Sequence, residues 1–232
     1  MKKHFLSSYT LSIYRECPRC FWHHVRKGKT FQRPEPPIST LPRGMDALIK
    51  EYFDQYRRAH TLPPELMSVS SGRLVEQQRM DAWRSWKTGL QYCRSDGHRL
   101  IGALDECLIE DGRYVPVDYK TRGFALRDNS ASYYVFQMSC YRFLLEKNGY
   151  PARDHAILVF YIPARVGDGG NVEFHRRAVR VETQPVDVTN AVFEDALSVL
   201  SGEQAPAPSD SCTFCAWAAK VASSPDPQMK LF

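Results

Sequence analysis

Two carboxylates and one lysine stand at a spacing that suits metal-dependent hydrolysis. Asp118 and Lys120 lie two residues apart in VPVDYKT, and Asp105 lies in the preceding apolar segment GALDECL. Side chains two apart on a β-strand project from the same face, so Asp118 and Lys120 should point the same way. Neighbouring carboxylates repel unless a cation lies between them, and hard oxygen ligands suit Mg²⁺ or Mn²⁺. A nearby ammonium can orient water or stabilise charge on a phosphate.

The elements that must position these residues form a predicted β-hairpin. Residues 98–110 and 114–122 alternate with the period of strands, and Asp111-Gly112 supplies the turn between them. The alternative for Asp118 is a solvated pair with Lys120 on an exposed strand edge. The flanking VPV favours a central, buried strand, where an unpaired carboxylate would be costly. A functional role is therefore favoured for Asp118.

The other expected elements are mainly helical. Apolar spacing and turn residues predict a second strand pair around a Gly-rich turn, and linker-like Ser/Pro/Ala segments over 201–211 and 221–227. The helices are expected over about residues 9–25, 43–59, 72–93, 130–149 and 187–202, and the second strand pair over 155–162 and 172–182.

Composition indicates a globular protein with a basic N-terminal part. The chain has 232 residues, is 43% hydrophobic and carries a net charge of +5. Residues 1–60 contain twelve Lys/Arg and five Asp/Glu, which suits either an anionic partner or a solvated basic face. No apolar run approaches the length of a membrane span, and no signal peptide is recognisable, so a cytoplasmic protein is expected.

The seven cysteines include two C-x-x-C pairs near opposite ends of the chain. Cys17 and Cys20 lie in CPRC, and Cys212 and Cys215 lie in CTFC. Four thiolates arranged as two close pairs can bind one tetrahedral zinc ion or one iron–sulfur cluster, which would join both ends of the domain. The alternative is two unrelated pairs of free thiols. The three single cysteines are expected in the core: Cys93, Cys107 and Cys140.

These motifs together resemble the PD-(D/E)XK nuclease superfamily, and within it the branch of RecB-like and AddB-like nuclease domains and CRISPR-associated adaptation nucleases. GALDECL, VPVDYKT, QMSCY and the flanking cysteines carry the resemblance over roughly residues 7–219. It implies an α/β, restriction-endonuclease-like fold with a mixed central sheet flanked by helices. It also implies hydrolysis of DNA phosphodiesters with magnesium or manganese.

The resemblance assigns roles to individual residues. Asp105 and Asp118 would be metal ligands, the carbonyl of Tyr119 could complete the ligand set, and Lys120 would position the attacking water. Two further residues, Gln137 and Tyr141, match the Q-x-x-x-Y element of this branch. Their i, i+4 spacing places them on one face of a helix, where they could contact the site or the DNA backbone; the alternative is an ordinary helix surface.

The chain departs from the family pattern in two places. Related nucleases often have a metal-binding histidine after a glycine in the helix before the sheet, whereas RGMDALIKEYF offers Asp46, with Glu51 as a weaker candidate. Asp is a suitable ligand for a hard cation. Iron–sulfur members usually supply one cysteine from the N-terminal region and three from the C-terminal region, whereas this chain supplies two and two. The resemblance favours a 4Fe–4S cluster, and a structural zinc ion is the alternative.

The chain ends in QMKLF, behind a Ser/Pro-rich segment. This pattern resembles the bacterial sliding-clamp-binding peptide, with Gln228 followed by an apolar residue, a variable residue and Leu-Phe. Met229, Leu231 and Phe232 would fill an apolar pocket of the clamp, and Gln228 would form directional hydrogen bonds. A flexible tether would raise the local concentration of such a weakly binding peptide. The alternative is a tail that docks on its own domain.

The sequence thus predicts a nuclease domain over residues 1–220 and a flexible tail with a clamp-binding motif over 221–232. The expected function is metal-dependent DNA hydrolysis in replication, repair or recombination, by an exonuclease recruited to the sliding clamp. Basic and aromatic residues interleave over 17–33 and 81–94, which suits DNA with single-stranded character; packing in the core explains many of these aromatic residues equally well. The alternatives are a non-catalytic DNA-binding module with this fold and a CRISPR-type DNA-processing nuclease.

Overall fold

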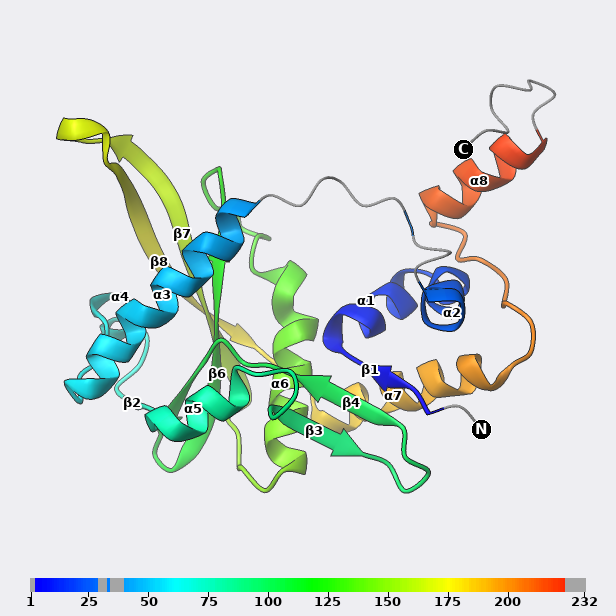
Figure 1. Ribbon diagram of the computed structural model, residues 1–232, viewed down its shortest axis with the longest axis horizontal. Helices are drawn as coiled ribbons and strands as arrows, with labels where there is room; N and C mark the ends of the chain where they lie inside the picture. Colours follow the sequence, from blue (N-terminus) through cyan, green and yellow to red (C-terminus); the bar gives the residue numbers. More distant parts are fainter. Residues whose placement is uncertain (1–2, 29–32, 34–39, 224–232) are drawn as a thin grey trace.

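A five-stranded mixed sheet lies at the centre of the protein, in a computed structural model that describes residues 3–28, 33 and 40–223 (Figure 1). Its strand order is β2-β5-β6-β7-β8, with β6 and β7 parallel and the other neighbours antiparallel. A smaller sheet has the order β1-β4-β3. The strands are β1 (Phe5–Leu6), β2 (Arg73–Leu74), β3 (Leu90–Cys93), β4 (Arg99–Gly102), β5 (Glu106–Glu110), β6 (Arg113–Thr121), β7 (His155–Val166) and β8 (Val172–Glu182).

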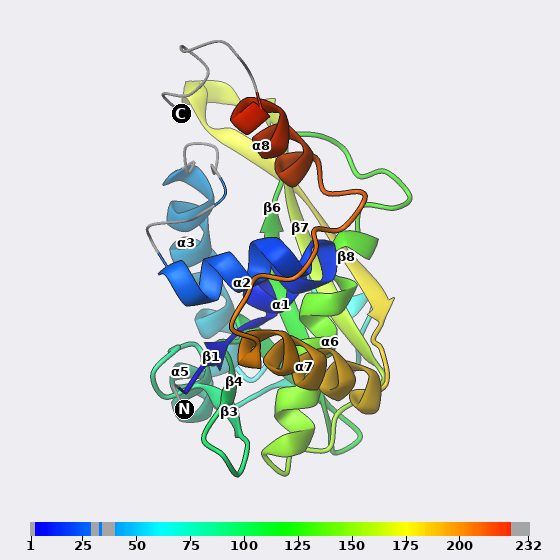
Figure 2. The ribbon, with the colours of Figure 1, turned by 90° about the vertical axis from the view of Figure 1, so that its right-hand side faces the viewer.

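Helices cover both faces of the large sheet, which confirms the predicted mixed sheet flanked by helices. One apolar core lies under α3 and α4, and a second lies under α1, α2, α6 and α7. Figure 2 looks from the side of α1 and α2 and shows α7 beside them. In the described ranges, no helix combines the length and apolarity needed to cross a membrane. The helices are α1 (Ser8–Glu16), α2 (Pro18–Lys27), α3 (Thr40–Arg58), α4 (Pro64–Met67), α5 (Gln77–Trp83), α6 (Val135–Lys147), α7 (Val186–Ser201) and α8 (Thr213–Ser223), with 3₁₀ turns η2 (Ser132–Tyr134) and η3 (Asp168–Gly170).

Strand β6 separates its two faces by alternation. Val115, Val117 and Tyr119 are buried in the core under α3, so Asp118 and Lys120 project from the opposite face, toward α6. Because side chains alternate along this buried strand, the ionisable residues lie on one face and the residues packed under α3 lie on the other. The parallel neighbour β7 follows after α6, which connects the two strands across this same face.

The predicted hairpin turn at Asp111-Gly112 is confirmed. Both residues have positive φ, 46° at Asp111 and 75° at Gly112. Positive φ at both central positions is the requirement of a type I′ turn, which Asp-Gly satisfies well. The turn sets the register of β5 on β6, from Glu110 opposite Arg113 to Glu106 opposite Val117.

Three predicted elements are divided in the structure. The helix expected over 9–25 breaks at Cys17, whose backbone is extended because Pro18 disfavours helical geometry in the residue before it. The helix expected over 72–93 is instead β2, α5 and β3, since pairing of β3 with β4 overrides a weak helical pattern. The strand expected over 98–110 is β4 and β5, which belong to different sheets.

Two further expectations are corrected at the periphery. Cys93 is exposed at the end of β3, whereas Cys107 and Cys140 lie in the core as predicted. An unpredicted helix, α8, continues through Ser223, into the linker-like segment expected over 221–227. None of the residues of α8 is buried, and Figure 1 shows this helix extending away from the layers beside α2.

Candidate active site and cysteine centre

The candidate active site lies where β6 runs past the end of its neighbour β5. Strand β5 begins at Glu106, opposite Val117, so β6 from Asp118 onward has no β5 residue beside it. Asp118 is 1% exposed. The Lys120 Nζ lies 2.5 Å from the Asp118 Oδ2, so the predicted alignment of these two side chains is confirmed.

Asp105 lies beside Asp118 at this edge. It is the last residue before β5, in the break that divides β4 from β5, and its side chain is 24% exposed. Burial first, and then the neighbouring charge of Asp105, raise the pKa of Asp118 to about 7, although Lys120 opposes the shift. The carboxylates thus lie close enough to resist simultaneous ionisation, which a bound cation would relieve.

Helix α6 contributes Gln137, whose side-chain amide forms hydrogen bonds with Asp118, Lys120 and Tyr141. Gln137 Nε2 donates to Asp118 Oδ1 at 3.0 Å and to the Tyr141 hydroxyl at 2.8 Å. Its Oε1 accepts from Lys120 Nζ at 3.1 Å. Gln137 and Tyr141 therefore lie on the face of α6 that contacts the site, as the i, i+4 spacing predicts. Burial and then Asp118 raise the pKa of Tyr141, which keeps its hydroxyl neutral.

Helix α3 brings one predicted and one unpredicted residue to the other side of Asp105. The Lys50 Nζ lies 2.7 Å from Asp46 Oδ2 and 3.3 Å from Asp105 Oδ1. Burial lowers the pKa of Lys50, but Asp105 and Asp46 outweigh it and raise the pKa overall. The sequence signal for Lys50 is its position four residues after Asp46. Glu51, the weaker candidate, is exposed on α3.

The side chain of Tyr119 points away from the site, into the core under α3. Its hydroxyl donates to Glu106 Oε2 at 3.3 Å, and its ring packs against Phe53 with centroids 4.7 Å apart. The prediction concerned the backbone carbonyl of Tyr119 and not this side chain. A role for that carbonyl in metal binding stays a prediction.

A buried ion-pair network behind the site was not predicted. Glu106 is fully buried, and its Oε2 accepts from Arg57 at 2.5 Å and from Arg84 at 3.1 Å. Arg84 also donates from Nε to the carbonyl of Asp105 at 3.1 Å and pairs with Asp54 at 2.9 Å. This network holds the backbone from which the Asp105 side chain projects. The available signal was Glu106 itself, a charged residue inside the apolar strand ECLIE.

The donor set suits a hard divalent cation. Asp118 Oδ2 is buried, and apart from the Lys120 ammonium it has no partner in the described part of the chain. Asp105 supplies a second carboxylate, and carboxylate and carbonyl oxygens are the ligands that Mg²⁺ and Mn²⁺ prefer. Asp46 is separated from this pair by the Lys50 ammonium. The residues present therefore fit the predicted metal best at Asp105 and Asp118.

The four paired cysteines converge at the other end of the molecule. The Sγ atoms of Cys17, Cys20, Cys212 and Cys215 lie within 4.8 Å of one another, and none of these residues forms a disulfide. Cys17 and Cys215 are 3.8 Å apart, Cys20 and Cys212 3.7 Å, and Cys20 and Cys215 3.4 Å. The thiols therefore form one four-residue group that joins the N-terminal helices to the start of α8.

The local sequence explains why these thiols meet. Pro18 sets Cys17 in extended backbone and starts α2, which places Cys20 in its first turn. Burial favours the neutral thiol, but backbone N–H groups of Cys20 and Ser209 lower the pKa of Cys17 to about 7. Arg33 donates to Cys212 Sγ at 3.7 Å. Hydrogen bonds thus stabilise the thiolate of Cys17, the form that binds metal, whereas burial raises the pKa of Cys20 and Cys215.

A groove of about 550 Å³ lies between α1 and the start of α6. Its wall includes Phe136, which precedes Gln137 on α6, but none of the candidate catalytic residues. Tyr133 on its rim is 73% exposed, and the Arg15 guanidinium lies 4.3 Å from the centroid of the Phe136 ring. The groove thus combines an exposed aromatic ring with a cation.

The aromatic segments predicted to contact DNA divide between core and surface. Phe21, Trp22 and Trp83 are buried and belong to the apolar core, so these rings cannot stack on bases. Trp86 is 67% exposed, with the Lys87 ammonium 5.5 Å from its ring centroid. The alternation of basic and aromatic residues in these segments mainly reflects core packing.

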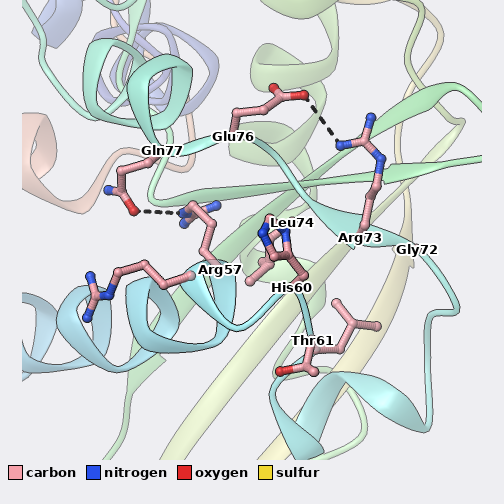
Figure 3. Close-up of a pocket in the computed structure, with 10 residues that line it drawn as sticks. Arg57, His60, Thr61, Gly72, Arg73, Leu74, Glu76 and Gln77 are labelled. Carbon is pink, nitrogen blue, oxygen red and sulfur yellow. Dashed lines mark hydrogen bonds and ion pairs between the residues drawn. The ribbon is translucent and has the colours of Figure 1, made fainter.

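A further cavity of about 400 Å³ lies away from the candidate active site, near the end of α3. Figure 3 shows Arg57 held by Gln77 and Arg73 paired with Glu76 around it; the Arg57 Nε lies 3.2 Å from Gln77 Oε1. None of the residues predicted to act in catalysis lines this cavity. Its size alone therefore does not mark the reactive site.

Comparison with known proteins agrees with the geometry of β6. No match was found among curated proteins. The sequence model of the PD-(D/E)XK nuclease superfamily matches residues 6–219, a range that contains the Asp105, Asp118 and Lys120 group and all four clustered cysteines. The chain therefore belongs to the PD-(D/E)XK nuclease superfamily.

Proposed function

We propose that this protein is a metal-dependent exonuclease that hydrolyses phosphodiester bonds of DNA with single-stranded character. The observation that carries the proposal is the buried Asp118 carboxylate, which pairs with the Lys120 ammonium and lies close enough to Asp105 for the charge of Asp105 to raise its pKa. Two carboxylates that repel each other next to a fixed ammonium form a site for a cation and a phosphate. If Asp118 had only a structural role, burial of its carboxylate would cost free energy of folding without a functional benefit.

In this proposal each residue of the site has a separate task. Asp105, Asp118 and the carbonyl of Tyr119 would hold the divalent ion, which when bound would polarise the phosphate and activate water. Lys120 carries an ammonium that can orient the attacking water and stabilise negative charge on the phosphate. The side-chain amide of Gln137 fixes the positions of Asp118 and Lys120 relative to each other through one hydrogen bond to each. Tyr141 is the partner that fixes the amide of Gln137.

The groove beside α6 supports a single-stranded substrate. Lys120 lies 4.6 Å from the centroid of the Tyr134 ring, and the neighbouring Tyr133 is exposed on the groove wall. An exposed tyrosine can stack on an unpaired base, and Arg15 can contact a phosphate. In this proposal a strand passes from Lys120 along the groove toward the cysteine centre.

For the cysteine centre we propose a structural metal, with zinc favoured over a 4Fe–4S cluster. Four sulfurs that are each 2.3 Å from one tetrahedral ion lie about 3.8 Å apart. The Sγ contacts of 3.4 to 3.8 Å are close to this value. In a 4Fe–4S cluster each cysteine binds a different iron, which sets the sulfurs farther apart.

Recruitment to a bacterial sliding clamp through Gln228, Met229, Leu231 and Phe232 is a further part of the proposal, and it places the nuclease in replication-linked repair or recombination. These residues lie outside the described ranges. Support comes from the QMKLF pattern and from its position beyond α8, which extends away from the layers.

The test is cleavage of end-labelled single-stranded and double-stranded DNA with Mg²⁺ or Mn²⁺ by anaerobically purified protein. We expect the wild type to cleave, and both Asp118→Ala and Lys120→Ala to lose at least about 100-fold in rate while still binding DNA. Lys220→Ala, which removes an exposed lysine outside the segments predicted to contact DNA, is the matched control. Resistance of circular single-stranded DNA would identify an exonuclease. Intact DNA with the wild type and both metals would instead indicate a non-catalytic DNA-binding module.

A further inference from the structure

Lys50 lies between two carboxylates that come from different parts of the chain. Its Nζ is 2.7 Å from Asp46 Oδ2, one turn away on α3, and 3.3 Å from Asp105 Oδ1, at the start of β5. The Lys50 side chain is 24% exposed. An ordinary i, i+4 pair on a helix surface has only one partner and is solvated. Lys50 differs because its second partner is a residue of the candidate active site.

The charged groups of the described site form a row. Ion pairs join Asp46 to Lys50, Lys50 to Asp105, and Asp118 to Lys120, and the Asp105 carboxylate lies beside that of Asp118. An ammonium thus lies on each side of the Asp105 and Asp118 pair. The contact between these two carboxylates is the one position in this row where two anions meet with no cation between them.

Charge balance limits how many divalent ions this row can accept. When all are ionised, the three carboxylates and two ammoniums carry a net charge of −1. One divalent ion brings the row to +1, whereas two ions would bring it to +3. Repulsion between the second ion and the positive charges already present would oppose its binding by several kcal/mol in a partly buried site. A single ion between Asp105 and Asp118 is therefore the favoured state.

We propose that Lys50 occupies the place of a second cation, between Asp46 and Asp105, so that the site binds one divalent ion. This inference rests on the proposed nuclease function. The ammonium neutralises Asp46 and pairs with Oδ1 of Asp105, which leaves Oδ2 of Asp105 and the Asp118 oxygens, shared with Gln137 and Lys120, for the ion. In this arrangement Asp46 forms an ion pair with Lys50 and does not bind the metal.

The first test counts Mn²⁺ ions bound to the full chain by electron paramagnetic resonance. We expect one ion per wild-type chain. Lys50→Met and Lys50→Gln should each bind a second ion, seen as a spin-coupled pair, because Asp46 and one oxygen of Asp105 are released. Lys87→Met removes an exposed lysine and should still bind one. Two ions on the wild type, or one ion on both folded Lys50 variants, would overturn the inference.

The second test combines Lys50 and Asp46 substitutions. Asp46→Asn should leave the single Mn²⁺ of the wild type in place, whereas Asp46→Asn added to Lys50→Met should abolish the second ion. Loss of the wild-type ion in Asp46→Asn would show that Asp46 binds the first ion and would contradict the inference. The proposed function is tested separately: if the wild type binds two ions and cleaves DNA, only the role of Lys50 fails, whereas no metal-dependent cleavage refutes the nuclease itself.

Discussion

The residues of the candidate active site are connected to one another by hydrogen bonds and ion pairs. Gln137 joins Asp118, Lys120 and Tyr141 through three hydrogen bonds of 2.8 to 3.1 Å. All polar groups of its amide are engaged, which fixes both its orientation and that of its partners. The side chains are thus held in place before substrate arrives, which is the condition for electrostatic catalysis.

The pKa of about 7 at Asp118 predicts how stability depends on pH in buffer without divalent ions. The unfolded chain releases this proton near pH 4, whereas the folded protein retains it until about pH 7. Because the folded state binds more protons in this window, raising the pH from about 4 to 7 should destabilise the fold, by about 2–4 kcal/mol from this group.

Urea unfolding at several pH values would measure this contribution. Asp118→Asn should remove the loss of stability between pH 4 and 7, because its amide does not ionise. Asp128→Asn, the same substitution at an exposed residue, should keep the wild-type pH profile. A pH profile of Asp118→Asn that matches the wild type would show that Asp118 is not the responsible group.

At the scale of elements, the site depends on where strands begin and end. Strand β5 begins at Glu106, so β6 from Asp118 onward has β7 on one side and no β5 residue on the other, and side chains from both faces of the sheet can meet at this open edge. Helix α3, packed on one face, can thus contribute Lys50 beside Asp105, while α6 contributes Gln137 from the other face. The Arg57, Arg84 and Glu106 network secures the first residues of β5.

Removal of Arg84 should therefore affect both stability and the site. We expect Arg84→Met to lower the free energy of unfolding by about 1.5–3 kcal/mol, because Glu106 and Asp54 each lose one of two cationic partners and keep Arg57. It should also reduce cleavage, since Arg84 holds the Asp105 carbonyl. Arg94→Met removes a more exposed arginine from a surface pair and should cost about 0–1 kcal/mol. Equal destabilisation by both substitutions would argue against the network.

At the scale of the whole molecule, the cysteine centre joins residues far apart in sequence. Ser209 donates its backbone N–H to Cys17 Sγ at 3.5 Å, and the Trp22 indole donates to the Gly202 carbonyl at 3.2 Å. The segment after α7 is thus attached to the N-terminal helices by few contacts besides the thiols. A metal there would stabilise the fold by binding only the native arrangement.

Loss of one clustered cysteine should release the metal and loosen this attachment. We expect Cys212→Ser to lose the metal measured by elemental analysis and to lower the melting temperature. Cys93→Ser, at an exposed single cysteine, should keep both. Colourless wild-type protein with one zinc per chain would support the zinc proposal, whereas brown protein with four irons would establish the cluster. Full metal retention in Cys212→Ser would refute the four-thiolate site.

The C-terminal pattern predicts a separable interaction. Deletion of residues 228–232 should abolish binding to a bacterial sliding clamp while DNA cleavage without the clamp is unchanged, because these residues lie outside the matched domain. Substitution of Lys230 by Ala, at the variable position of the pattern, should retain clamp binding. Equal clamp binding by the full and shortened chains would reject this role for the tail.

The sequence by itself determined the features that are local in the chain. The alternation around Asp118 and Lys120 required only that VPVDYKT be a strand, and the Asp-Gly turn required only its own φ angles. The i, i+4 spacing of Gln137 and Tyr141 required only a helix. Such properties follow from the geometry of one element, so a single sequence is sufficient to predict them.

Tertiary structure decided which elements meet. The division of 98–110 into two sheets follows from strand partners that lie elsewhere in the chain, and it set Asp105 in the break beside Asp118. Lys50 looked like an ordinary helix residue because only packing of α3 brings it to Asp105. Long-range strand pairing and helix packing depend on the whole fold, and local periodicity does not show which elements will meet.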